Sequence, residues 1–412
     1  MILETPLLRR VLILADETAD WKVAGLRQLD RLVLSIQQIA AEQRRPVSVC
    51  VWWKPEVNAD RRCLPADARL SDVQVTDAAK EFLREENTVD LVLSTRLCLF
   101  HNGLKDMLEG LSGSAIVMPE SGVRWQDQLA AFENTMAAAV TLQQGTPWQV
   151  LSSRSEIRDC ERALLRHSGK TQDGLVSRYL NRPISRAISR QLLKTQLQPS
   201  TWSVLIFALP FCAAFAFLQG TYLGFIVGCA IFQLYSILDG CDGEISRAKF
   251  LQTEFGRRLD SFCDFVGNMM LAICLGFGLA WQAHGPQALG WIYIVEGFAA
   301  AVLIGLGEGI VFLRRTRGEN APTKKRWNGM LYQRHHEFLE KSGILFLGEN
   351  FAWWLVALTK RDMAMLAFLI FAIVAQPEWS LHLLLLVSAI SSALAGNAFL
   401  RPSTAVVPQE AS

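Results

Sequence analysis

The stretch DGCDGEISRAKFLQTEFGRRLDSFCD, residues 239–264, decides the architecture of this chain because it separates two long apolar runs. Asp239 and Asp242 are three residues apart, and Asp260 and Asp264 are four apart. If both parts are helical, each pair lies on one helical face, and two facing helices bring all four carboxyl groups together. Carboxylates clustered at a membrane boundary repel one another unless cations lie between them. The stretch therefore predicts a site for a hard cation, Mg²⁺, Mn²⁺ or Ca²⁺.

The residues around the aspartates predict that the cations hold a diphosphate. Gly243 and Gly256 allow a backbone to approach a ligand closely, and the guanidinium of Arg247 suits phosphate oxygens. Two metal ions can stabilise charge on the attacking and leaving oxygens, while a spare carboxylate takes a proton from an incoming hydroxyl. The pattern therefore favours substitution at a phosphoryl group.

Six apolar runs are long enough, or nearly so, to cross a bilayer as helices of ~20 residues. They are residues 201–218, 222–239, 264–283, 289–313, 363–376 and 380–400. Six crossings place both termini on one side of the membrane. A further apolar stretch, 344–359, is typical of a helix that lies on the membrane surface.

The distribution of basic residues predicts the orientation of these spans. The loops after the first, third and fifth runs contain no Lys or Arg. The alternate loops carry Arg247, Lys249, Arg257, Arg258, Arg314, Arg315, Arg317, Lys324, Lys325, Arg326, Lys360 and Arg361. By the positive-inside rule, the aspartates and both termini face the cytoplasm of an integral membrane protein, in the inner or plasma membrane if the source is bacterial.

Composition restricts the class of protein. Of the 412 residues, 51% are hydrophobic, and this excess comes from residues 199–402, whereas 1–198 are of ordinary mixed composition. A net charge of +2 gives no basic field for nucleic-acid binding. The nine cysteines show no C-x-x-C spacing, which is typical of a reducing compartment and indicates no zinc site. His335 and His336 lack a third ligand and are interpreted as loop residues.

The first half alternates β-branched runs with helical patterns, which favours a parallel, Rossmann-like α/β sheet. The expected strands are 11–15, 47–53, 89–94 and 114–118, and the expected helices are 25–43, 77–86 and 126–143. Residues 171–198 then carry a basic residue at every fourth position, at Arg178, Arg182, Arg186, Arg190 and Lys194. This stripe predicts an amphipathic juxtamembrane helix that presses on anionic headgroups.

The aspartate stretch carries a family resemblance. D-x-x-D-G-x-x-A-R-x8-G-x-x-x-D-x-x-x-D is the signature of the CDP-alcohol phosphotransferases, and only Ser246, in place of Ala, departs from it. The resemblance implies that Asp239, Asp242, Asp260 and Asp264 bind two Mg²⁺ or Mn²⁺ ions, with Asp260 and Asp264 catalytic and Asp264 the general base. It implies nucleotide contacts by Gly243, Ser246, Arg247 and Gly256.

The same resemblance implies the reaction and the partners. A phospho-alcohol group passes from a CDP-linked donor to a hydroxyl acceptor, a lipid or a polyol phosphate, and CMP leaves. The six-span domain, residues 199–402, would lie among membrane lipids, and such proteins are usually homodimers. The segment DGLVSRYLNRPIS, residues 173–185, is similar to one in inositol-phosphate members.

The first domain, residues 1–170, resembles a sugar nucleotidyltransferase fused to such inositol-type relatives. The Gly-rich phosphate loop of that fold is replaced by ADETADWKVAG, residues 15–25, and VLSTRLC, residues 92–98, holds no metal-binding Asp. We therefore expect a degenerate, regulatory or structural domain. Residues 171–198 form the juxtamembrane helix, and 403–412 form a tail.

Two other functions stay open from the residues. A carboxylate-based transporter would place its charges near mid-bilayer and show repeat symmetry, and no internal repeat is present. An inactive membrane scaffold would not need all four aspartates. Glu296 and Glu308 lie within the fourth run, where carboxylates are costly. Glu308 is a candidate for the acceptor pocket or a structural ion pair, and Glu296 for a polar cleft.

Overall fold

The computed structural model describes residues 7–85, 88–110, 116–117, 124–142, 146–168, 174–283, 290–316 and 360–400. Contacts divide the chain into two units. The first comprises Met1–Lys170, Arg186–Gln198 and Gly243–Gln252, and the second comprises Thr171–Ser185, Pro199–Asp242 and Thr253–Ser412. Helix α9 (Tyr222–Lys249) contributes to both units, because its last two turns belong to the first unit and the rest to the second unit.

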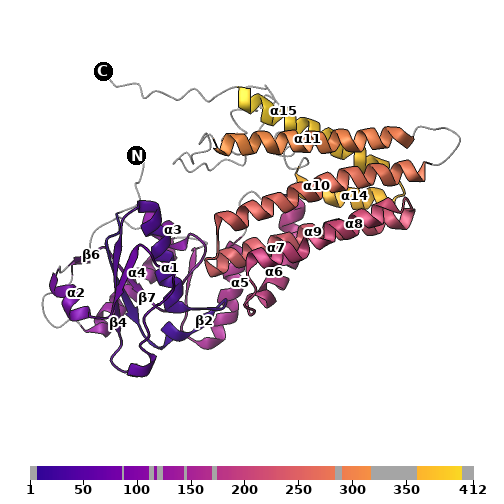
Figure 1. The fold of residues 1–412 in the computed structure, drawn as a ribbon. Helices are drawn as coiled ribbons and strands as arrows, with labels where there is room; N and C mark the ends of the chain where they lie inside the picture. Colours follow the sequence, from indigo (N-terminus) through magenta and orange to yellow (C-terminus); the bar gives the residue numbers. More distant parts are fainter. Residues whose placement is uncertain are drawn as a thin grey trace, which may run out of the picture. The chain divides into compact units, whose positions relative to one another are not determined.

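A parallel four-stranded sheet forms the centre of the first unit (Figure 1). Its order is β5 (Val73–Thr76), β4 (Val47–Trp53), β1 (Arg10–Ala15) and β7 (Leu91–Ser94). Five of the six residues of β1 are buried, which is typical of a strand covered on both faces. The predicted parallel α/β domain is confirmed.

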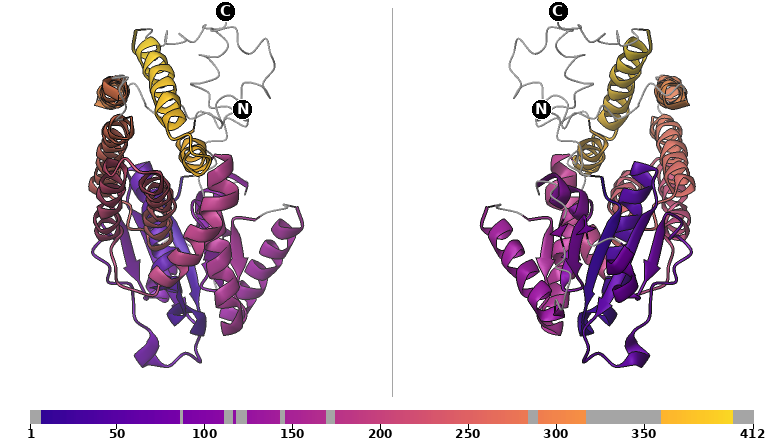
Figure 2. Two further views of the ribbon diagram at one scale, coloured as in Figure 1. Left: turned by 90° about the vertical axis from the view of Figure 1, so that its right-hand side faces the viewer. Right: turned by 90° about the vertical axis from the view of Figure 1, so that its left-hand side faces the viewer.

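Helices cover both faces of this sheet. Helix α1 (Gln28–Gln43) and helix α4 (Trp125–Leu142) lie on opposite sides of the strands, as Figure 2 shows. The indole Nε1 of Trp125 donates a hydrogen bond of 3.0 Å to the carbonyl oxygen of Trp52 on β4. Two shorter helices belong to the same unit: α2 (Ala79–Glu85) contacts β4, and α3 (Gly103–Gly110) contacts α1.

Short antiparallel elements differ from the expectations. The helix expected from residue 25 begins at Gln28, because β2 (Lys22–Val23) and β3 (Leu26–Arg27) form a hairpin before it. In the stretch 114–118 the described residues are β9 (Ile116–Val117), which pairs antiparallel with β6 (Thr88–Val89) and not with the central sheet. A third pair joins β8 (Leu97–Leu99) to β10 (Trp148–Val150).

Helices make up the described part of the second unit. In chain order they are α7 (Pro199–Ile206), α8 (Ala208–Leu218), α9, α10 (Glu254–Gln282), α11 (Gly290–Thr316), α14 (Arg361–Ile373) and α15 (Glu378–Leu400). Four segments are long and apolar enough to cross a membrane: Pro199–Leu218, Tyr222–Lys249, Glu254–Gln282 and Gly290–Gly309. The apolar part of α15, Glu378–Ala393, is shorter, and α14 has 13 residues. The described residues thus give four candidate spans where six were expected.

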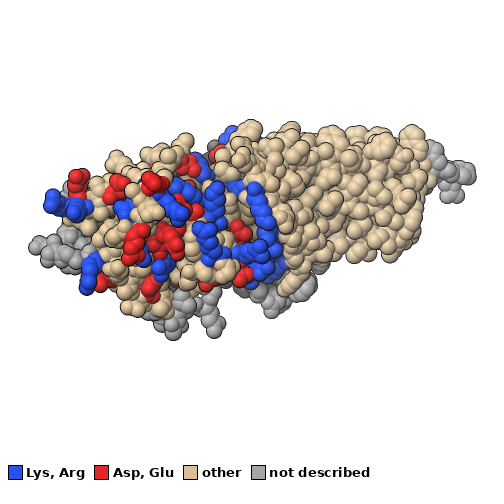
Figure 3. Space-filling model, turned by 90° about the horizontal axis from the view of Figure 1, so that it is seen from below, with Lys and Arg blue, Asp and Glu red and all other residues tan. Residues whose placement is uncertain are grey.

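The surface of these helices is apolar. Figure 3 shows a broad face of the helical unit that carries almost no Lys, Arg, Asp or Glu. Large apolar side chains of these helices, such as Phe215, Leu223 and Trp291, are exposed by more than half of their area. Soluble monomers rarely expose so much contiguous apolar surface, so this unit has the surface typical of an integral membrane protein.

The first span is interrupted by a proline. Helices α7 and α8 are separated at Phe207, and Pro210 follows within the first turn of α8. Proline has no N–H to donate to the carbonyl of Ile206 four residues earlier, so the regular ladder is broken at this point.

Helices α10 and α11 approach each other closely through two glycines. A methyl group added to Gly276 would lie 2.5 Å from the carbonyl oxygen of Tyr293, and one added to Gly297 would lie 2.7 Å from that of Ala272. Small residues let membrane helices pack with their backbones in contact. The two glycines therefore fix the spacing of this helix pair, whose members lie side by side in opposite directions in Figure 1.

A helical segment precedes the first span. Helix α5 (Ile157–His167) belongs to the first unit, and a π-helical turn (Ser177–Asn181) leads into α6 (Arg182–Leu192). The orientation expected for the basic stripe is wrong at Arg182, which is 7% exposed, whereas Tyr179 is 74% exposed. At this point the arginine packs inward and the apolar neighbours face outward. The predicted helix 344–359, His335, His336 and the tail 403–412 lie outside the described residues.

Candidate metal and nucleotide site

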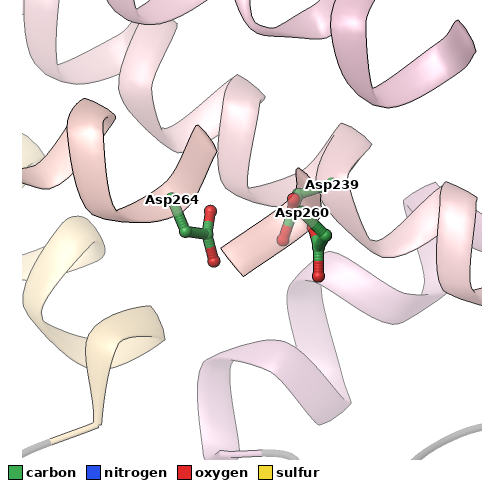
Figure 4. A group of neighbouring side chains, drawn as sticks. All are labelled: Asp239, Asp260 and Asp264. Carbon is green, nitrogen blue, oxygen red and sulfur yellow. The ribbon is translucent and has the colours of Figure 1, made fainter. Parts of the chain in front are cut away.

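Three of the four predicted aspartates come together in the second unit. Asp239 on α9 and Asp260 and Asp264 on α10 each offer a carboxylate oxygen, and these three oxygens lie within 4.8 Å of one another. In Figure 4 the Asp264 carboxyl group points toward Asp239 and Asp260. The two helices therefore aim their acidic side chains into one shared space.

The helix ends explain this arrangement. Helix α9 continues past its apolar run to Lys249, and α10 begins at Glu254, well before its own apolar run. Thr253 caps α10, because its Oγ1 accepts a hydrogen bond of 3.0 Å from the amide of Gly256. Asp260 and Asp264 thus stand one turn apart on a single helix, so both face α9.

Asp242 is not part of the group of three described above. Its Oδ2 accepts a hydrogen bond of 2.7 Å from Oγ of Ser203 on α7. The neighbouring Trp202 donates from Nε1 to the carbonyl oxygen of Leu238 at 3.0 Å. These contacts fasten the first span to the turn of α9 that carries the aspartates.

Asp264 has two further partners that the sequence patterns did not indicate. The hydroxyl of Tyr235 on α9 donates to Oδ1 at 3.1 Å, and the guanidinium of Arg361, at the start of α14, forms an ion pair with Oδ2. The guanidinium carbon of Arg361 also lies 5.6 Å from the centroid of the Tyr235 ring. The sequence assigned Arg361 only to a basic loop, and a partner nearly a hundred residues away leaves no local signal.

Arg182 approaches the backbone between Asp239 and Asp242. Its Nη1 donates to the carbonyl oxygen of Gly240 at 3.5 Å, and a methyl group at Gly240 would lie 3.2 Å from the same nitrogen. Cys241 also contacts α6, since its Sγ lies 3.5 Å from the carbonyl oxygen of Ser185. A glycine at position 240 lets α6 pack directly on this turn.

The residues that the resemblance assigned to the nucleotide lie at two helix ends. Gly243, Ser246 and Arg247 occupy the last two turns of α9, within the first unit. The Oγ of Ser246 donates to the carbonyl oxygen of Gly243 at 3.1 Å. Gly256 lies in the first turn of α10, in the second unit.

The donor set fits a divalent cation. Arg361 supplies one positive charge beside a group of three carboxyl groups. Carboxylate oxygens are the ligands that hard cations prefer, and among the described residues no histidine or cysteine joins the group.

A different polar cluster lies at the carboxyl edge of the sheet in the first unit. Asp16, directly after β1, accepts hydrogen bonds from the amide of Thr18 at 2.9 Å and from Nε of Arg96 at 2.7 Å. Burial alone would raise the pKa of Asp16, but the hydrogen bonds from Thr18 and Arg96 hold it below its ordinary value. These contacts lie at the edge where this kind of sheet usually binds a nucleotide.

Of the two intramembrane glutamates, Glu296 has a partner. Its Oε1 lies 2.6 Å from Nδ1 of His382, which joins α11 to α15. Glu308 is exposed, and no ion pair to it is present among the described residues.

Comparisons with known proteins give a family match for the helical part of the chain. Residues 197–397 match the family model for CDP-alcohol phosphatidyltransferase. The chain is 37% identical over 137 residues to a bifunctional IPC transferase and DIPP synthase from Thermococcus kodakarensis, which covers 33% of this chain and 31% of the relative. It is 36% identical over 154 residues to a protein of the same description from Rubrobacter xylanophilus, covering 36% and 35%.

The chain thus spans about a third of the length of these curated relatives. Among solved structures, phosphatidylinositol phosphate synthase from Mycobacterium tuberculosis, in complex with manganese and citrate, aligns at a TM-score of 0.38 and 16% identity. That alignment covers 55% of this chain and 93% of the other. The family match covers residues 197–397, just under half of the 412 residues, and over that stretch the chain is similar to CDP-alcohol phosphatidyltransferases.

Proposed function

We propose that this protein is a membrane CDP-alcohol phosphotransferase. It moves a phospho-alcohol group from a CDP-linked donor to an acceptor hydroxyl, with release of CMP, in the synthesis of phospholipids or related polar inositol compounds. The observation that carries the proposal is the group of three carboxylates shared by α9 and α10, inside the matched family domain.

The proposed cofactor is Mg²⁺ or Mn²⁺, two ions in the full site, held by Asp239, Asp260 and Asp264 with Asp242 adjacent. When bound, the cations supply positive charge that stabilises the diphosphate and the departing CMP. Gly243, Ser246, Arg247 and Gly256 are the proposed nucleotide contacts.

A side chain of the protein accepts the proton of the acceptor hydroxyl. The acceptor oxygen forms a bond to the phosphorus of the alcohol phosphate, and the bond from that phosphorus to the bridging oxygen breaks. The bridging oxygen leaves with CMP, and the hydroxyl proton passes to the Asp264 carboxylate, which is therefore the general base. Tyr235 and Arg361 fix the orientation of that carboxylate, since each contacts one of its oxygens.

The proposed acceptor is a lipid or a polyol phosphate. The relatives named above point toward inositol compounds, and the donor is CDP-diacylglycerol or a soluble CDP-alcohol. We further propose that the domain crosses the membrane six times, with α14 and α15 as the last two crossings and the aspartates on the cytoplasmic side. A homodimer among membrane lipids is the proposed assembly.

The test is release of CMP. Purified protein in lipid nanodiscs is incubated with Mg²⁺ or Mn²⁺ and a panel of CDP-alcohols and acceptors, and CMP is followed by mass spectrometry. We expect release that needs both substrates and the metal. A transporter or an inactive scaffold would release no CMP with any pair.

A further inference from the structure

Helix α9 ends in a turn that has an unusual residue type at its left-handed position. Leu251 donates its amide to the carbonyl oxygen of Ser246 at 2.8 Å, which closes the helix as in a Schellman motif. Phe250, at the left-handed position, has a φ of 55°. Glycine usually fills that position, and a side chain there is strained by about 1–2 kcal/mol. Other contacts must therefore hold this turn.

Two arginines of the first domain supply those contacts. Arg31 on α1 donates from Nη1 to the carbonyl oxygen of Ala248 at 2.8 Å. Arg69, in the loop before β5, donates from Nη1 to the carbonyl oxygens of Lys249 at 2.9 Å and Phe250 at 2.8 Å. Arg31 and Arg69 thus donate hydrogen bonds to three successive carbonyl oxygens at the end of α9. Carbonyl groups at a helix end have no partner within the helix. The two guanidinium charges also lie at the negative end of the helix dipole.

Both arginines are themselves held in place. Arg31 is 1% exposed, and its Nη2 donates to the carbonyl oxygen of Val23 at 2.7 Å, in the β2–β3 hairpin. Val23 itself lies in residues 15–25, the stretch expected to replace a Gly-rich phosphate loop. Asp67 accepts from Nε of Arg69 at 2.8 Å and from its Nη2 at 2.5 Å, which orients the guanidinium.

Two more contacts fix the same turns. Lys249 donates from Nζ to the carbonyl oxygen of Thr195 at 2.7 Å. The carboxylate of Glu244, which is fully buried, accepts a hydrogen bond of 2.7 Å from Oγ of Ser189. The whole segment 243–252 is thereby anchored in the first unit.

We infer that Arg31 and Arg69 are positioning residues for the nucleotide segment of α9, and that positioning this segment is the role of the first domain. The first domain has filled its own nucleotide edge with side-chain contacts and uses two arginines to fix Gly243, Ser246 and Arg247. This inference rests on the proposed function, in which those three residues contact the cytidine diphosphate.

The decisive variant is Arg69→Ala, because Arg69 lies in a partly exposed loop and its loss should leave the fold intact. Arg62→Ala is the matched control: Arg62 also donates to two carbonyl oxygens of the first unit, those of Val57 at 3.0 Å and Pro55 at 3.1 Å, and neither acceptor lies on α9. Arg69→Lys and Arg31→Lys, which keep the charge but lose the paired geometry, are the second set.

Two quantities are measured on the full chain in nanodiscs, with thermal unfolding to verify folding. The first is amide hydrogen exchange of residues 243–252, and the second is the affinity for CDP with Mg²⁺. We expect Arg69→Ala to raise exchange in this segment and weaken CDP binding about tenfold, with Arg69→Lys intermediate and Arg62→Ala unchanged.

Unchanged exchange in Arg69→Ala would overturn the anchoring of the segment, and raised exchange with unchanged CDP affinity would overturn the positioning role. If the wild-type protein binds no CDP, the proposed function fails instead. In that case the exchange data alone still decide whether the two arginines hold the helix end.

Discussion

The hydroxyl of Tyr235 donates a 3.1 Å hydrogen bond to Oδ1 of Asp264, and this bond ties α9 to α10 beside the grouped carboxylates. Arg361 pairs with the other oxygen of the same carboxylate. Asp264 therefore has one fixed orientation, in which it faces Asp239 and Asp260 (Figure 4). The chemistry proposed for the site depends on that orientation.

Replacement of Asp264 by Asn should abolish transfer while metal is retained. The amide cannot accept the acceptor's proton, so CMP release should fall by about 10²–10⁴-fold. Mn²⁺ binding, measured by electron paramagnetic resonance, should weaken but persist, because two carboxylates of the group remain. Normal turnover in this variant would remove Asp264 as the base.

Loss of the Arg361 guanidinium should slow the reaction without preventing donor binding. In Arg361→Gln the carboxylate of Asp264 loses a charged partner worth about 1.5–3 kcal/mol, which corresponds to roughly 10–100-fold in kcat. Tyr235→Phe removes only a neutral donor and should cost less. Steady-state kinetics of CMP release compares the two variants. A larger loss in Tyr235→Phe would contradict this assignment.

The grouped aspartates should bind metal more strongly than Asp242 does. Asp239→Asn removes one of three carboxylates that lie within 4.8 Å of one another, so the affinity for Mn²⁺ should fall at least about tenfold. Asp242→Asn, whose partner is Ser203, should have a smaller effect in the same titration. An equal loss of Mn²⁺ affinity in both variants would place Asp242 among the metal ligands, as the family pattern implies.

The buried Asp16 should make the first domain sensitive to acid. The pKa of Asp16 in the folded protein is lowered from its ordinary value of 3.8, against the effect of burial, by its hydrogen bonds to Thr18 and Arg96. A lowered pKa gives stability that is present above the ordinary value and is lost as the pH falls through the folded value. Thermal unfolding between pH 6 and pH 3 should therefore show a steeper decline for the wild type than for Asp16→Asn. Asp159→Asn, at an exposed pair with Arg162, serves as the control. Parallel declines in wild type and Asp16→Asn would refute the role of this carboxylate.

The sequence predicted the parts of the fold that depend on regular patterns. The runs at β1, β4 and β7 are apolar over several residues, as buried parallel strands must be, and the spacing of the aspartates indicated helices on both sides of the loop after α9. The β2–β3 hairpin was missed because strands of two residues leave no periodic signal. The extension of α10 to Glu254 was also missed, since hydropathy marks only the lipid-facing part of a helix.

Contacts between distant residues could not be predicted from local patterns. Arg361 and Asp264 belong to different helices, and so do Arg31 and Ala248. The sequence around each residue gives no indication of its partner. The basic stripe of α6 shows the reverse problem. Its four-residue spacing is compatible with a face toward headgroups or toward α9, and only packing distinguishes the two for Arg182.

The close approach of α10 and α11 at Gly276 and Gly297 limits how this protein can be engineered. A designer who seeks a more heat-resistant version would ordinarily exchange helical glycines for alanine, because alanine favours the helix by roughly 1 kcal/mol. At these two positions the added methyl group would meet a backbone carbonyl oxygen at 2.5 Å or 2.7 Å, so α10 and α11 would have to separate. Since α10 also carries Asp260 and Asp264, a substitution made to increase stability would displace these two grouped carboxylates, although it lies far from them along the helix.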